Sequence, residues 1–141
     1  MQFNYSMSYF KEDKMKLGLL LALLVSSNVF AASKVYFVKP HNNEVVAKTF
    51  DVEFGIEGMA VEKAGVMKEN TGHHHIIIDG KPVEKGQVIG KDDTHKHFGD
   101  GSNKTSLTLA PGKHTLTLQF ADGAHKSYGS DMAATITVEV K

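Results

Sequence analysis

The sequence contains no cysteine, no tryptophan and no arginine among its 141 residues. Without cysteine, the chain can form no disulfide, carry no lipid on a thiol and offer no thiolate ligand to a metal ion. Lysine provides all of the 16 basic side chains, and 16 Asp and Glu residues balance them. This balance argues against a basic nucleic-acid-binding surface and against a polybasic membrane anchor. Any metal site in this chain must therefore be built from imidazole and carboxylate groups.

The sequence also lacks a long apolar segment. Its main apolar run covers residues 17–25, whereas a membrane-spanning helix needs about 20 residues. Three lysines precede this run and a Val-Phe-Ala sequence ending at Ala31 follows it, which is the order of a secretory signal peptide. We therefore predict a signal peptide over residues 1–31, which would gain the usual Met-Lys opening if translation began at Met15. Residues 32–141 are expected to form one histidine-rich domain, periplasmic or secreted in a bacterium, with no membrane anchor after cleavage.

Alternation of apolar and polar residues recurs along the chain, whereas helical periodicity of useful length does not. The alternation is clear over residues 49–57, 113–120 and 134–140. The run Ile76–Ile78 does not alternate, which indicates a strand covered on both faces. Residues 81–93 are polar and only weakly strand-like. About seven short strands separated by turns predict an all-β fold, an immunoglobulin-like antiparallel β-sandwich.

The chain is rich in histidine, with eight residues of this type. Residues i and i+2 of a strand point to the same face, with Cα atoms about 6.5–7 Å apart. His73 with His75, and His95 with His97, could therefore converge on one ion at metal–nitrogen distances of about 2.0–2.1 Å. Imidazole ligands suit zinc, copper and nickel. These four residues form the predicted metal site.

Other residues are assigned auxiliary or structural roles. His125 lies in a polar loop that could fold over the site and add a ligand. Asp79 has the same parity as the first histidine pair and could bind the metal, but it serves equally well as a turn residue before Gly80. His74 points to the opposite face of its strand, which favours a structural role. His114 is expected to lie on the same face of its strand as the core residues there. We expect it to donate a hydrogen bond to a backbone carbonyl.

Four motifs resemble a family of small exported bacterial proteins that is classed as a domain of unknown function. They are GHHHxxID at residues 72–79, HxHFGxG at 95–101, PGxHTL at 111–116 and DxxH at 122–125. The resemblance extends over residues 34–141. It implies export and places the motif histidines together as a signature, and it implies no particular activity.

The opening of the domain is also similar to that of periplasmic copper carriers with an immunoglobulin-like barrel. This similarity rests on the strand–proline–turn–strand sequence from Val35 to Phe54. Those carriers use a histidine at the mature N-terminus, whereas this chain would begin Ala32-Ser33-Lys34.

These observations predict a periplasmic protein that binds a transition metal, copper or zinc, for carriage, buffering or sensing. The alternative is a non-metal interaction module in which a histidine-lined patch binds a partner protein or a cell-envelope polymer. That alternative calls for exposed aromatic side chains, for which Tyr36, Phe98 and Tyr128 are the candidates. A histidine patch without metal would also respond to pH. A hydrolytic metal site is favoured least, because no carboxylate has the spacing of a general base and no nucleophile motif is present.

Overall fold

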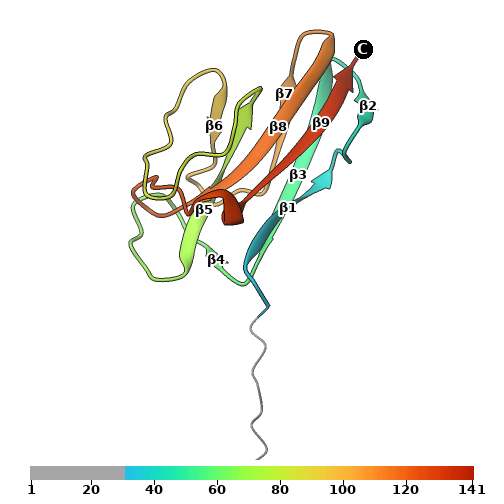
Figure 1. Cartoon of the computed structure of the whole chain (residues 1–141). Coiled ribbons are helices and arrows are strands. Elements are labelled where there is room, and N and C mark those ends of the chain that lie inside the picture. The colour runs from blue at the N-terminus through green and yellow to red at the C-terminus, as the bar shows by residue number, and fades with distance from the viewer. Residues whose placement is uncertain (1–30) are drawn as a thin grey trace, which may run out of the picture.

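Two β-sheets packed face to face form the fold (Figure 1). The computed structural model describes residues 31–141, so the predicted signal peptide lies outside the described residues except for Ala31. Within the described part, no helix is long and apolar enough to cross a membrane. The predicted all-β sandwich is confirmed, although residues 31–141 contain nine strands rather than about seven because several are very short.

The smaller sheet has three antiparallel strands in the order β1-β3-β7. They are β1 (Lys34–Lys39), β3 (Thr49–Glu57) and β7 (Lys104–Thr108). The alternation predicted for residues 49–57 is present: Phe50, Val52 and Phe54 are buried, whereas Asp51 is exposed. This sheet supplies one wall of the hydrophobic core.

The larger sheet has the order β2-β9-β8-β5-β4, and β6 pairs with β5. Its strands are β2 (Glu44–Val46), β4 (Ala60–Val61), β5 (Thr71–Ile78), β6 (His95–His97), β8 (Gly112–Ala121) and β9 (Ala133–Val140). The short 3-10 helix η1 (Ser130–Met132) precedes β9. The weakly strand-like residues 81–93 lie in the loop between β5 and β6, where Val88 alone forms an isolated bridge, to Lys126.

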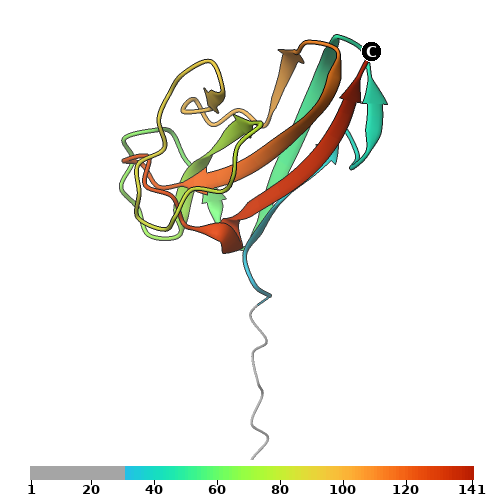
Figure 2. The same ribbon diagram turned by 45° about the horizontal axis from the view of Figure 1, so that its top comes forward.

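Strand β5 is buried along its whole length, with all eight of its residues in the buried class. Its inner face, with Ile76 and Ile78, packs into the hydrophobic core beside Leu118. Its outer face is covered by the loops at 79–94 and 122–129, which lie on the same side of the sandwich in Figures 1 and 2. The absence of alternation in this strand therefore reflects burial on both faces, as the sequence predicts.

Candidate metal centre

Three histidines meet on the outer face of strand β5. The antiparallel register of β5 and β6 places His75 directly opposite His97, and their ring centroids are 5.2 Å apart. His73 lies two residues before His75 on the same face, with ring centroids 4.8 Å from His75 and 5.0 Å from His97. Strand pairing alone thus brings three imidazoles together.

A fourth imidazole, that of His125, reaches this face from the loop after β8. The carboxylate of Asp122 holds the loop in a tight turn by accepting hydrogen bonds from the backbone N–H groups of Ala124 at 2.8 Å and Lys126 at 2.9 Å. His125 has a φ of 64°, in the sparsely populated left-handed region. Its ring centroid is 4.7 Å from that of His97, and its Nδ1 is 3.1 Å from Nε2 of His73.

One nitrogen from each of these residues lies within 4.8 Å of the other three. We call this set the four-histidine group: His73, His75, His97 and His125. Tetrahedral coordination with metal–nitrogen bonds of about 2.0–2.1 Å places the ligand nitrogens about 3.3–3.4 Å apart. The nitrogens of the group lie within 4.8 Å of one another, so the group could hold one ion if its side chains closed around it.

The four-histidine group contains buried nitrogens that form no hydrogen bond. They are Nδ1 of His73, Nδ1 of His75 and Nε2 of His97. A buried polar group without a partner costs about 1–3 kcal/mol. Histidines that only braced a loop would be expected to satisfy their ring nitrogens. The orphaned nitrogens of the group are compatible with a ligand, and the core residue His74 also has two such nitrogens.

Three imidazoles of the group, those of His73, His75 and His97, are held in their neutral form. Burial, followed by the neighbouring rings of His97 and His125, lowers the pKa of His73 from 6.5 to about 4, against the opposing effect of Asp122. Burial, followed by the other histidines, lowers the pKa of His75 to about 3. The pKa of His97 is also lowered, chiefly by burial. At neutral pH these rings carry lone pairs that can bind a metal.

The structure places His95, one of the four histidines of the predicted site, outside the group. The β5–β6 register puts His95 opposite Ile77, two pairs beyond His75 and His97. Its Nδ1 lies 2.9 Å from a carboxylate oxygen of Asp92. Sequence parity correctly indicates a shared face for His95 and His97, but the register that excludes His95 depends on how β6 pairs with β5.

Asp79, the predicted auxiliary carboxylate, also lies away from the group. It follows His75 by four residues, which corresponds to about 13 Å along a strand. Its Oδ1 accepts a hydrogen bond from the backbone N–H of Thr115 at 2.9 Å, and its Oδ2 is 2.7 Å from Nδ1 of His114. The other ring nitrogen of His114 is 2.9 Å from the carbonyl oxygen of Ala110, which agrees with the predicted bond to a backbone carbonyl. Asp79 and His114 thus tie β5 to β8.

His74 lies on the inner face of β5, as its parity predicts. Its ring centroid is 4.9 Å from that of Phe54 and 4.9 Å from that of Phe120. Burial lowers its pKa to about 4, which the backbone of Gly55 opposes, although neither ring nitrogen forms a hydrogen bond of normal geometry. His74 is therefore part of the hydrophobic core.

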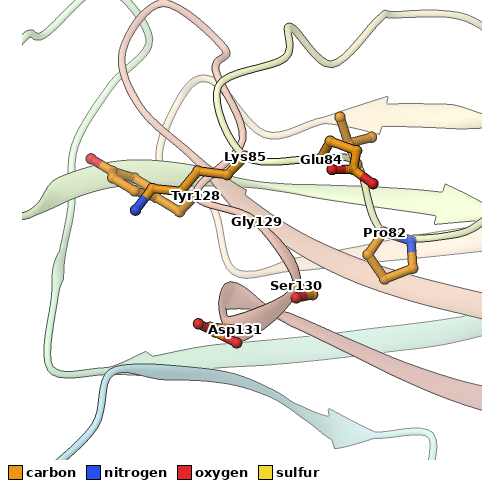
Figure 3. A pocket seen from close by; sticks show the side chains of 8 residues that line it. Pro82, Glu84, Lys85, Tyr128, Gly129, Ser130 and Asp131 are labelled. Atoms are coloured by element: carbon orange, nitrogen blue, oxygen red, sulfur yellow. The ribbon is translucent and has the colours of Figure 1, made fainter.

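Two cavities lie beside the loops that cover β5. One, of about 280 Å³, opens onto the four-histidine group and is lined by His75, Ile89, Gly90, Lys91, His97 and His125. The sequence pattern does not predict that residues 89–91 line this cavity, because only the fold of the long β5–β6 loop brings them beside the histidines. The other cavity, of about 300 Å³, lies between residues 82–85 and 128–131 and contains no histidine (Figure 3).

The aromatic residues considered for an interaction surface do not gather into an exposed platform. Phe98 is buried, with 7% of its surface exposed. Tyr128 is half-buried, and its hydroxyl donates a hydrogen bond to the carbonyl oxygen of Thr71. Only Tyr36 of the three is exposed.

A comparison with protein families identifies a relationship over most of the domain. The family model described as Domain of unknown function (DUF4399) matches residues 52–141, which include the whole four-histidine group. Comparisons with curated proteins and with solved structures found no match. Because the family model covers more than half of the sequence, the chain belongs to the family of the domain of unknown function DUF4399.

Proposed function

We propose that this protein binds one transition-metal ion through the four-histidine group. The observation that carries the proposal is the convergence of four imidazole nitrogens within 4.8 Å of one another. The buried nitrogens of this group that form no hydrogen bond support it further. An orphaned nitrogen that bound the ion would gain a partner, which would remove the cost of leaving it unsatisfied.

The donor set favours copper or zinc. All four ligands are imidazoles, which suit zinc, copper and nickel, and copper(II) binds most tightly among these divalent ions. Calcium and magnesium prefer oxygen ligands, and no carboxylate belongs to the group. Copper and zinc are therefore the ions to test first.

The role that fits this site best is carriage, buffering or sensing of the metal, in the periplasm or outside the cell. The wall of the adjoining cavity contains no carboxylate that could act as a general base, which supports a binding role over hydrolysis. The proposed location rests on the signal-peptide pattern of residues 1–31. Because the proposed ligands are all imidazoles, this function is compatible with a sequence that has no cysteine.

Calorimetric titration of the tag-free, metal-stripped protein with Cu(II) and with Zn(II) tests the proposal. We expect one ion per chain and a dissociation constant in the micromolar range or tighter. A His97→Ala/His125→Ala variant should lose at least a hundredfold in affinity, because half of the ligands are gone. Both residues are only partly buried, so this variant should remain folded, which circular dichroism checks.

A matched control removes two histidines outside the group. His41 is exposed and His95 is engaged with Asp92. A His41→Ala/His95→Ala variant should therefore bind metal as the native protein does. Absence of binding by the native protein, or equal affinities of the two double variants, would refute the proposed site.

A further inference from the structure

The cavity beside the four-histidine group bears directly on how a metal ion would be bound. Three members of the group, His75, His97 and His125, lie on the wall of this cavity of about 280 Å³. An ion coordinated by the group would therefore adjoin the cavity. Gly90 adds no side chain, and no atom lies within 4 Å of the position that a Cβ would take there. The space next to the site thus remains open to a small molecule.

The charge of the proposed site is not balanced by its ligands. Four neutral imidazoles leave a divalent ion with its full double positive charge, and burying an uncompensated charge is costly. Lys91 adds another positive charge on the cavity wall.

Two nearby carboxylates, those of Asp122 and Asp100, keep their charge and accept hydrogen bonds within their own loops. Asp122 accepts hydrogen bonds from two backbone N–H groups of its own turn. Asp100 accepts hydrogen bonds from the backbone N–H of Ser102 at 2.9 Å and from its hydroxyl at 2.7 Å. Neither aspartate belongs to the cavity wall. Two positive centres, the ion and Lys91, would therefore share one cavity without an anionic side chain among its lining residues.

We infer that this cavity is an anion subsite, in which a small carboxylate binds the metal as a fifth ligand beside the four imidazoles and pairs with the ammonium group of Lys91. This inference rests on the proposed function, because the ion supplies one of the two positive centres. The buried apolar side chain of Ile89 in the wall suits a carboxylate with a short alkyl group. The protein would then take up its metal as a complex with a small carboxylate from the surrounding solution.

Acetate serves as the probe. The metal-stripped protein is loaded with one equivalent of Cu(II), or of Co(II) as a coloured substitute for zinc, in a buffer whose only added salt is a perchlorate. Acetate is then titrated while the visible absorption of the metal is recorded. We expect a saturable spectral change, and at least a tenfold increase in metal affinity when acetate is present.

The variants Lys91→Gln and Lys85→Gln separate the subsite from a general charge effect. Both lysines lie in the β5–β6 loop, but Lys85 lines the other cavity (Figure 3). Lys91→Gln should weaken acetate binding about tenfold, while the metal affinity without acetate stays equal or rises because a nearby positive charge is removed. Lys85→Gln should behave as the native protein does.

The outcomes distinguish this inference from the proposed function. If the protein binds metal but its spectrum does not respond to acetate, the anion subsite is refuted and the metal site stands. An acetate response that is the same in both lysine variants also overturns the subsite, since Lys91 would then have no part in it. If the native protein binds no metal at all, the proposed function fails, and the subsite fails with it.

Discussion

Replacing the imidazole of His74 with an aliphatic side chain should make the protein more resistant to acid. His74 is 1% exposed and lies between the rings of Phe54 and Phe120. Its pKa in the folded state is about 4, against an ordinary value of 6.5, mainly because burial disfavours the charged ring. Leucine has a similar volume and no polar atoms, so His74→Leu leaves no unsatisfied nitrogen in the core.

The pH dependence follows from the lowered pKa. Above pH 6.5 the ring is neutral in both the folded and the unfolded chain, so it causes no loss of stability with pH. Below pH 6.5 the unfolded chain takes up a proton that the folded chain does not, so stability falls until the pH reaches the folded pKa of about 4. At about 1.4 kcal/mol per pH unit, His74 alone accounts for a loss of about 2 kcal/mol between pH 6.5 and pH 5.

Urea unfolding of the metal-free protein at pH 7.5 and pH 5.0 measures this difference. The native protein should lose about 2 kcal/mol more on acidification than His74→Leu. His41→Leu serves as the control because His41 is exposed, and its loss should equal that of the native protein. If His74→Leu loses as much stability as the native protein, burial of His74 is not a source of acid sensitivity and the reasoning is wrong.

Three further changes test the site and its surroundings. Gly99→Ala would place a Cβ 2.3 Å from Cε1 of His97. It should displace that ring and weaken metal binding about tenfold, or about 1.4 kcal/mol, in calorimetric titration; an unchanged affinity would show that His97 is not a ligand. His95→Ala should leave the metal affinity unchanged, and a large loss would place His95 in the coordination shell. Asp79→Asn should lower the raised pKa of His114, chiefly by weakening the side-chain hydrogen bond between them, as an NMR titration of the imidazole protons would show. If that pKa stays where it is, the ion pair contributes nothing to it.

Much of the site can be predicted from the sequence, because strand geometry assigns faces without knowledge of the partners. The parity of His73, His74 and His75 is enough to put the middle residue in the core and the outer two on the opposite face. The missing alternation at Ile76–Ile78 likewise indicates burial on both faces of β5.

The remainder of the site depends on contacts between distant segments. His97 joins the group and His95 does not because of the register of a three-residue strand, which short sequence patterns do not fix. His125 reaches the group through a turn with a positive φ, held by Asp122. Lys91 reaches the cavity through the course of a long loop. No periodicity in the sequence encodes these arrangements.

The four-histidine group is divided between two kinds of structure, and this division sets how a bound ion would leave. His73 and His75 belong to a strand that is buried throughout, so they are expected to move only when the whole domain opens. His97 lies in a three-residue strand and His125 in a loop, and such elements open locally at much lower cost. An acceptor could therefore draw the ion out by displacing the second pair while the first still holds it. Release would proceed by ligand exchange at the loop side, at a rate set by loop opening and independent of global unfolding.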